Sequence, residues 1–282
     1  MLVIKKIAVC GAGTMGSGIA QIIAQHGFET VLFDLNEEVL NKSKQLIESS
    51  LQTLVLKNKI TKEEEQQTLS NIQFTSNINN CKAHLIIEAI IENKEAKLNL
   101  FKQVEKINSK ETIIASNTSS ISISQLAAEI QHPQKFVGMH FFNPATIMKL
   151  VEIIKTNATN NIVIEQLCLL SKALGKTAVV CNDAPGFIVN RVARHYYLEA
   201  MKLVELNLAT IENVDAIMQA SGFKMGPFKL MDLIGMDINY NVSNIVWNDL
   251  GKPERLKPSI IQQQKVEAKQ LGKKTGKGFY NY

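Results

Sequence analysis

Three glycines near the amino terminus constrain the fold of this chain more than any other feature of its sequence. Gly11, Gly13 and Gly16 follow an apolar, β-branched run at residues 6–10 and precede an amphipathic run that Gly27 ends. This order predicts a strand, a tight turn and a helix. Gly11 permits the turn, Gly13 leaves room for a backbone to approach a pyrophosphate, and Gly16 lets the helix pack close to the strand. The pattern therefore predicts a nucleotide-phosphate site at the start of the helix.

A carboxylate follows at the position in the chain that would bind the ribose of such a nucleotide. Residues 29–33 have the pattern of a second strand, and Asp34 lies at its end, about 20 residues beyond the glycines. A carboxylate there can accept the ribose hydroxyls of NAD, and its charge disfavours the additional phosphate of NADP. We therefore predict NAD as the cofactor, with NADP less favoured. A glycine turn that binds nothing is the alternative, and the strand–turn–helix context argues against it.

The composition restricts the kinds of partner. The 282-residue chain is 45% hydrophobic and 20% charged, with a formal net charge of +5, which is ordinary for a globular protein. Its positive charge comes almost wholly from scattered lysines, so we expect no nucleic-acid partner. No apolar run has membrane-spanning length, and the first strand begins within a few residues of Met1, so we expect no membrane partner, signal peptide or transit peptide. The cysteines lack metal-ligand spacing, and we expect no metal, reduced thiols and a cytoplasmic location.

Strand-like and helix-like runs alternate through the first two thirds of the chain. Beyond Asp34, helical runs separate strand-like segments at residues 72–74, 84–88, 112–116, 136–142, 150–154 and 177–180. This alternation predicts a largely parallel sheet that helices cover on both faces, with ligands at the carboxyl ends of the strands. We therefore predict an α/β Rossmann-type nucleotide-binding domain over residues 1–182.

A long helical run interrupts this alternation after the second strand. Helical periodicity extends from Val39 to about Lys59, and a capping-box pattern at residues 61–64 begins a shorter helix over residues 63–69. These runs predict a helical hairpin that projects from the nucleotide-binding domain. Its exposed face carries Lys42, Lys44, Lys57 and Lys59 beside Ser49 and Ser50. Such a face is either simply solvated or a clamp for the phosphates of a long acyl carrier.

The strand pattern stops at residues 182–186. Helical runs follow at residues 187–206, 211–220, 228–250 and 258–271, with Gly235 as a candidate break in the third. We therefore predict an all-α domain over residues 183–282. The first of these runs is apolar on nearly every side, which requires burial against more than one neighbour. We expect this domain to pair with a second copy in a homodimer.

His140 is the strongest candidate for an acid–base residue. An enzyme that oxidises an alcohol with a nicotinamide needs a base for the hydroxyl proton, and histidine suits that role near neutral pH. His140 ends an apolar strand where the ligand crevice of the sheet should lie, and Glu152 on the next strand can hold its imidazole. Taken singly, a histidine at a strand end is more often structural, and a strand carboxylate is more often exposed or ion-paired.

Two further polar positions can bind a substrate oxygen. Ser119 lies in the turn at residues 117–120, between a strand and a helix, where a helix cap is the simpler interpretation. Asn190 lies on an otherwise apolar helix face and needs a partner. Both side chains can donate a hydrogen bond to a substrate oxygen as negative charge develops on it.

Seven segments of the sequence together resemble the L-3-hydroxyacyl-CoA dehydrogenase family, in its compact single-function bacterial form. The segments are GAGTMGSGIAQ (11–21), ASNTSS (115–120), GMHFFNP (138–144), MKLVE (148–152), APGFIVNR (184–191), MGP (225–227) and KTGKGFY (274–280). The resemblance spans nearly the whole chain, in order. It implies that His140 is the catalytic base and that Glu152 is its partner. It also implies that Ser119 and Asn190 contact the reacting oxygen and the thioester region of the substrate.

The resemblance also implies which residues bind the cofactor and the acyl carrier. With the glycine loop, the expected NAD site comprises Gly11, Gly13, Thr14, Met15, Gly16, Asp34, Glu92, Lys97, Asn117, Asn143 and Lys274. Ser50 and Lys57 match the positions at which the family binds the CoA moiety, which favours the phosphate clamp over the solvated face. In this family the C-terminal domain carries the dimer contact.

These expectations combine into a predicted reaction. The chain should catalyse the reversible, NAD-dependent oxidation of a short-chain (S)-3-hydroxyacyl-CoA, such as 3-hydroxybutyryl-CoA, to the 3-oxoacyl-CoA. Two departures from the family, at residues 146–147 and 194–197, can reshape the acyl pocket, so the chain length stays open. A dehydrogenase of free hydroxy or sugar acids and a non-catalytic NAD-binding structural protein are the alternatives. Ser50 and Lys57 argue against the first, and the complete set of catalytic candidates argues against the second.

Overall fold

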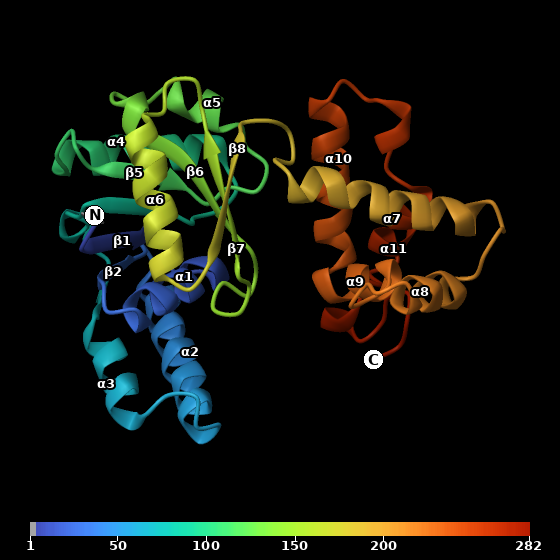
Figure 1. Cartoon of the computed structure of the whole chain (residues 1–282), viewed down its shortest axis with the longest axis horizontal. Coiled ribbons are helices and arrows are strands. Elements are labelled where there is room, and N and C mark those ends of the chain that lie inside the picture. The colour runs from blue at the N-terminus through green and yellow to red at the C-terminus, as the bar shows by residue number, and fades with distance from the viewer. Residues whose placement is uncertain (1–3) are drawn as a thin grey trace. The chain divides into compact units, whose positions relative to one another are not determined.

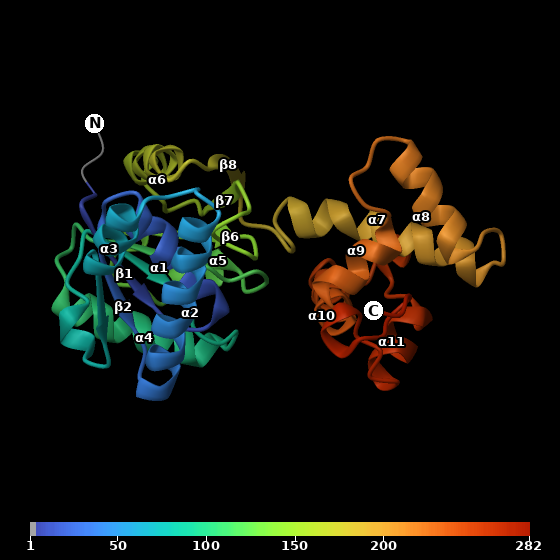
Figure 2. The same ribbon diagram turned by 90° about the horizontal axis from the view of Figure 1, so that it is seen from below.

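Figures 1 and 2 show the computed structural model of the chain, which describes residues 4–282. The chain divides into two units, of which the first ends at Asp183 and the second is Ala184–Tyr282. All the strands named below belong to the first unit, and the second is helical. This confirms the predicted fold class, an α/β nucleotide-binding domain followed by an all-α domain. Within residues 4–282, no helix is both long and apolar enough to cross a membrane.

An eight-stranded sheet forms the centre of the first unit, in the order β3-β2-β1-β4-β5-β6-β7-β8. The strands are β1 (Lys6–Cys10), β2 (Glu29–Phe33), β3 (Ile72–Thr75), β4 (Leu85–Glu88), β5 (Ile113–Ser116), β6 (Phe136–Phe141), β7 (Leu150–Lys155) and β8 (Thr177–Asn182). Neighbouring strands are parallel from β3 to β6, whereas β7 is antiparallel to β6 and parallel to β8. The carboxyl ends of β1, β2, β4, β5 and β6 therefore lie at one edge of the sheet.

Helices on one face of this sheet share its main core. They are α1 (Thr14–Gln25), α2 (Glu37–Leu56) and α6 (Asn161–Ala173), and their buried apolar side chains join those of β1, β2, β6 and β7 in one cluster. The α1 helix contains Ile19 and Ile23, both fully buried, at the four-residue spacing that a helix needs to keep two side chains on one face. Burial of this apolar stripe fixes the start of α1 beside the end of β1.

The other face of the sheet carries the residues on which the chemistry depends. The ring of Phe101 in α4 (Lys94–Ile107) packs edge-on against Phe136 of β6, with ring centroids 5.1 Å apart. Alternate residues of a strand point to the same face, so Phe136, Gly138 and His140 share this face. The packing of α4 against β6 therefore fixes the face from which the His140 side chain projects.

The predicted hairpin is confirmed and projects from the first unit as α2 and α3 (Lys62–Ser70), coloured blue to cyan in Figure 1. The capping box at its turn is complete, because Thr61 Oγ1 accepts from the backbone N–H of Glu64 at 3.2 Å and the Glu64 carboxylate accepts from the N–H of Thr61 at 2.7 Å. Asn58 has a φ of +50°, which ends α2 and reverses the chain. Local capping signals thus suffice to specify this projection.

The second unit contains five α-helices around a separate apolar core. They are α7 (Val189–Glu205), α8 (Ile211–Ala220), α9 (Pro227–Ile234), α10 (Met236–Asp249) and α11 (Ile260–Glu267). The predicted break at Gly235 is confirmed, since this residue has a φ of +102° and separates α9 from α10. A left-handed backbone of this kind favours glycine, which explains why one periodic run becomes two helices.

The predicted end of the last helix is wrong. The periodic pattern extends to residue 271, but α11 ends at Glu267 and Lys269 has a φ of +55°. Beyond it the chain packs on the buried carboxylate of Asp232, which accepts a hydrogen bond of 2.9 Å from the backbone N–H of Phe279. A contact distant in sequence, rather than helical periodicity, therefore determines the backbone conformation after α11.

Candidate active site

The loop between β1 and α1 has the geometry that its glycines predict. Gly11 has a φ of +107°, and a Cβ there would lie 2.5 Å from the carbonyl oxygen of Ala89. A Cβ on Gly16 would collide with the carbonyl oxygen of Gly11. A Cβ on Gly13, in contrast, would meet no atom within 4 Å, so this residue faces open space directly before α1 begins. The loop is thus tightly packed at Gly11 and Gly16 and open at Gly13, as a pyrophosphate site requires.

Asp34 joins this loop to the base of the hairpin. Its Oδ2 accepts a hydrogen bond of 2.8 Å from the backbone N–H of Ala12, and its Oδ1 accepts one of 3.0 Å from that of Asn36. Asn36 in turn caps α2. A carboxylate has about four lone-pair positions, so each oxygen keeps capacity to accept a ribose hydroxyl. The open loop and this half-buried carboxylate fit the dinucleotide that the sequence predicts.

Glu92 fixes the turn that carries Ser119. Its Oε1 accepts hydrogen bonds from Thr118 Oγ1 (2.5 Å), the backbone N–H of Ser119 (3.1 Å) and Ser120 Oγ (2.9 Å). Burial raises the pKa of this carboxyl, but the nearby Lys97 ammonium and these hydrogen bonds outweigh it and hold the pKa below its ordinary value. Glu92 is therefore ionised at neutral pH, and its hydrogen bonds order the turn at residues 117–120.

A buried ion pair lies behind this turn. Lys97 Nζ is 2.6 Å from Glu88 Oε1 and 3.1 Å from Glu92 Oε2, and the Lys97 side chain is only 1% exposed. Glu88 also accepts hydrogen bonds from Ser116 Oγ at 2.6 Å and from the backbone N–H of Ile90 at 2.8 Å. Burial raises the pKa of Glu88, and the attraction of Lys97 opposes that rise. Lys97, predicted to contact NAD, here joins a buried carboxylate to Glu92.

His140 and Glu152 form a buried pair across two strands. The antiparallel register of β6 and β7 places them directly opposite each other. His140 Nδ1 lies 2.8 Å from Glu152 Oε2, and the two side chains are 8% and 1% exposed. With Nδ1–H donating to the carboxylate, Nε2 is the nitrogen that can accept a proton. The carboxylate can also stabilise the imidazolium that forms.

Asn117 connects the ends of two strands beside this pair. Its Oδ1 accepts a hydrogen bond of 2.8 Å from the backbone N–H of Phe141, the residue after His140. Asn143 follows β6 and is exposed. Gly11, Asp34, the turn at residues 117–120 and His140 thus all lie at or just beyond the carboxyl ends of neighbouring strands. These positions form one crevice edge of the first unit.

The hairpin carries the two residues predicted to bind CoA. Ser50 is half-buried and accepts a hydrogen bond of 3.1 Å from Gln21 Nε2 of α1. Lys57 is exposed at the end of α2. The other lysines of this face, Lys42, Lys44 and Lys59, are exposed as well. The lysine face is thus open to solvent and available to an anion.

Two of the predicted site residues belong to the second unit. Asn190 is half-buried in the first turn of α7, and its carbonyl oxygen accepts a hydrogen bond of 3.0 Å from Arg194 Nε. Lys274 Nζ forms an ion pair with the carboxylate of Asp237, with 2.6 Å to Oδ2. Their roles toward substrate and cofactor stay predictions.

Sequence reasoning missed several residues that hold the crevice in place. Glu88 is fully buried at the end of an otherwise apolar strand, which is a detectable signal because such a carboxylate needs a cation. Lys176, also buried, donates from Nζ to the carbonyl oxygens of Ala145 (2.6 Å) and Met148 (2.8 Å), which anchors the connection after β6. Nothing in the local sequence around Lys176 indicates those partners.

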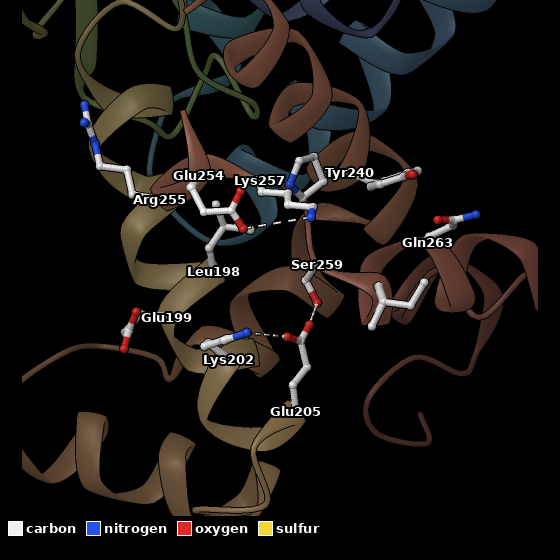
Figure 3. A pocket seen from close by; sticks show the side chains of 12 residues that line it. Leu198, Glu199, Lys202, Glu205, Tyr240, Glu254, Arg255, Lys257, Ser259 and Gln263 are labelled. Carbon is white, nitrogen blue, oxygen red and sulfur yellow. Dashed lines mark hydrogen bonds and ion pairs between the residues drawn. The ribbon is translucent and has the colours of Figure 1, made fainter. Parts of the chain in front are cut away.

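Two hollows of the surface lie away from the predicted site residues. One, in the first unit, is lined by Ile4, His84 and Ile113 among others, at the amino ends of the strands. The other, in the second unit, lies beside α7 and α11 (Figure 3). It combines cations with carboxylates, namely Lys202, Arg255 and Lys257 with Glu199, Glu205 and Glu254. Its charges compensate one another, so it has no clear preference for an anion.

Both units match models of one protein family. The first matches the model described as 3-hydroxyacyl-CoA dehydrogenase, NAD binding domain, over residues 6–184. The second matches the model described as 3-hydroxyacyl-CoA dehydrogenase, C-terminal domain, over residues 186–282. The two matches together account for nearly the whole chain.

Individual relatives agree with this match. The 3-hydroxyadipyl-CoA dehydrogenase of Escherichia coli (strain K12) is 43% identical over 284 residues, and the chain spans 60% of that relative's length. The 3-hydroxybutyryl-CoA dehydrogenase of Mycobacterium tuberculosis is 36% identical over 283 residues, which cover 99% of both chains. The crystal structure of (S)-3-hydroxybutyryl-CoA dehydrogenase from Ralstonia eutropha superposes with a TM-score of 0.95 at 36% identity and covers 99% of both chains.

Proposed function

The chain belongs to the 3-hydroxyacyl-CoA dehydrogenase family, and we propose from this premise that it oxidises an (S)-3-hydroxyacyl-CoA reversibly to the 3-oxoacyl-CoA with NAD. The observation that carries the proposal is the buried His140–Glu152 pair at the carboxyl edge of the sheet. A base with an oriented imidazole is what removal of a hydroxyl proton requires. The glycine loop and Asp34 lie at the same edge, where NAD supplies the acceptor for the hydride.

His140 handles the proton in both directions. In oxidation its Nε2 takes the proton of the 3-hydroxyl, while Glu152 holds Nδ1–H and stabilises the resulting imidazolium. In reduction the imidazolium returns that proton to the carbonyl oxygen. Glu152 holds the imidazole through Nδ1, on the side away from the nitrogen that exchanges the proton, and is therefore a positioning residue rather than a proton carrier.

Ser119 and Asn190 hold the oxygen on which the proton moves. Each can donate a hydrogen bond to the 3-oxygen as negative charge develops there. Glu92 fixes the backbone of Ser119, so the point from which this side chain projects is set before the substrate arrives. A fixed backbone lowers the cost of orienting the donor during the reaction.

The remaining predicted residues bind the cofactor and the acyl carrier. Asp34 binds the adenosine ribose of NAD, and its charge repels the additional phosphate of NADP. Ser50 and Lys57 bind CoA through the exposed lysine face of the hairpin. The relatives above are named for butyryl and adipyl substrates, which differ at the end of the acyl chain but are both short. We therefore propose a short-chain substrate. We also propose that the enzyme acts in the cytoplasm.

Initial rates test this function and the cofactor preference together. We expect the purified chain to reduce acetoacetyl-CoA with NADH, and to do so faster than with NADPH at the same concentration, because Asp34 repels the additional phosphate. Free acetoacetate should be reduced far more slowly, because it lacks the CoA moiety that the hairpin binds. The measurement is NADH or NADPH absorbance over time.

The other outcomes each identify a different function. Faster turnover of the free acid would indicate a hydroxy-acid dehydrogenase. Binding of NADH without turnover of any 3-oxoacyl-CoA would indicate a non-catalytic NAD-binding protein. Equal rates with NADH and NADPH would contradict the proposed role of Asp34 in cofactor selection but not the proposed reaction.

We further propose that the second unit forms a homodimer. Its surface exposes large apolar side chains, among them Val192, Ile217, Leu233 and Ile238, each at least half exposed. Exposed apolar side chains of this size, where they gather in one patch, are usually covered in a protein–protein contact. We expect light scattering at micromolar concentration to give about twice the 31.4 kDa of one chain. A mass of one chain would contradict this assembly.

A further inference from the structure

Arg194 is a buried cation with no acidic partner. It lies on α7 and is only 3% exposed. Among residues 4–282, no Asp or Glu forms an ion pair with it; its Nε donates to the carbonyl oxygen of Asn190, and its Nη1 donates to the carbonyl oxygen of Asn239 (2.8 Å) and to Ser243 Oγ (3.0 Å). Burial lowers its pKa to about 10, so it keeps its charge at neutral pH. The ring of Tyr197 lies over the guanidinium, with Cζ 4.9 Å from the ring centroid, but no anion balances the charge. A buried charge without an anion is costly unless a ligand or partner supplies one.

The unused donors around Arg194 indicate what would complete it. Five N–H groups project from a guanidinium, and within the described residues Nη2 has no assigned partner. The neighbouring Asn239 is 1% exposed, and its Nδ2 is buried without a hydrogen-bond partner. A cation and an orphaned amide donor together favour an acceptor-only, anionic group. A carboxylate fits best, because its oxygens only accept hydrogen bonds, so it can accept from the free Nη2 and also balance the charge of the guanidinium.

The mixed-charge hollow of the same unit provides a contrast. There Lys202 lies 3.8 Å from the carboxylate of Glu205, which also accepts a hydrogen bond from Ser259 Oγ (Figure 3). Lys257 likewise lies 3.9 Å from Glu254. These cations have acidic neighbours, whereas Arg194 has only neutral ones. Arg194 is therefore the cation of this unit most in need of an anion from outside the chain.

Position along α7 connects Arg194 to the substrate. Asn190 is the residue proposed to bind the 3-oxygen, and Arg194 follows it by four residues, which places both on one helix face about 6 Å apart along the axis. A few methylene groups beyond the 3-carbon span such a distance. The far end of a short acyl chain would thus reach Arg194 while its 3-oxygen stays at Asn190.

We propose that Arg194, with Asn239, binds a second carboxylate at the far end of the acyl chain, so that the preferred substrate is the CoA thioester of a 3-hydroxy dicarboxylic acid. This inference rests on the proposed function. It adds a residue that selects among acyl chains of equal length by their terminal group. A methyl-ended chain would leave the Arg194 charge and the Asn239 amide unpaired. Unpaired buried polar groups discriminate between substrates more strongly than a difference in apolar contacts does.

Two substrates of equal length test this selection in the unmodified enzyme. We expect kcat/KM for 3-hydroxyadipyl-CoA, which ends in a carboxylate, to exceed that for (S)-3-hydroxyhexanoyl-CoA, which ends in a methyl group, by roughly tenfold or more. The difference should lie mainly in KM, because Arg194 does not touch the reacting atoms. Equal values for the two substrates, or a preference for the methyl-ended chain, would overturn the inference and leave Arg194 as a crosslink between α7 and α10.

Substitutions then locate the selecting residue. In Arg194→Met we expect the ratio of the two kcat/KM values to fall by about tenfold or more. In Arg194→Lys we expect it to fall by less, because lysine keeps the charge but lacks the fixed planar arrangement of donors. Arg255→Met removes an exposed arginine of the same unit and should leave the ratio unchanged. An unchanged ratio in a folded Arg194→Met enzyme would also overturn the inference. No turnover of either thioester would instead contradict the proposed function itself, and this inference with it.

Discussion

His140→Gln retains NADH binding but loses turnover by a factor on the order of 10²–10⁴, the usual contribution of a general acid–base group. Glutamine preserves much of the side-chain volume and can keep a hydrogen bond to Glu152, which lies 2.8 Å from the imidazole. It cannot take up a proton at neutral pH, so only the chemical step is affected. The measurement is the single-turnover rate with acetoacetyl-CoA, and NADH fluorescence gives cofactor affinity separately.

His84→Gln is the matched control for this substitution. His84 belongs to the same unit and is exposed at the amino end of β4, where its Nδ1 accepts a hydrogen bond from the backbone N–H of Lys6 at 3.2 Å. It lies at the sheet edge opposite to the crevice, so we expect near-normal turnover. If His140→Gln also kept near-normal turnover, His140 would not be the base.

Lys97→Met should lower the free energy of unfolding by about 3–5 kcal/mol, as expected when one partner of a buried ion pair is removed. The Lys97 and Glu88 side chains are 1% and 0% exposed, so water cannot take over the lost contact. Burial already raises the pKa of Glu88, and without Lys97 it rises further. A carboxyl with a raised pKa in the folded state binds a proton on folding, so stability falls as pH increases through the interval between its unfolded and folded pKa values. The deficit in the free energy of unfolding of Lys97→Met should therefore be larger at about pH 8 than at about pH 5.

Urea unfolding at these two pH values measures the deficit. The double substitution Glu88→Gln/Lys97→Met should recover part of it, because a neutral amide tolerates burial without a cation. Lys135→Met is the control, because its ion-pair partner Glu111 is exposed, so water can take over the lost contact and the loss of stability should be much smaller. Equal deficits for Lys97→Met and Lys135→Met would contradict the importance of burial here.

Local signals explain why much of the fold could be predicted from the sequence. The glycines of the first loop, the capping box at Thr61 and the left-handed Gly235 each specify the backbone within a few residues. The end of α11 was wrongly predicted, because Asp232 holds the chain beyond it from a distant position in the sequence. Element type therefore follows from nearby residues, and an exact boundary depends on tertiary contacts.

The same division applies to the candidate site. His140 and Glu152 stand out because each is polar within an apolar strand, yet the antiparallel pairing of β6 and β7 that makes them partners is not encoded by periodicity. The Arg194–Asn239 contact joins two helices and is likewise invisible in either helix alone. Residue type thus indicates a chemical role, whereas the identity of its partner requires the three-dimensional structure.

The antiparallel pairing of β6 and β7 has an evolutionary consequence. Main-chain hydrogen bonds fix the register of His140 and Glu152, so their alignment does not depend on the length of the chain at residues 142–149 that connects the two strands. Insertions, deletions or new side chains in this connection can remodel the neighbouring surface while the proton-transfer geometry is conserved. An ancestor with this arrangement could diversify its ligand preferences without losing its chemistry.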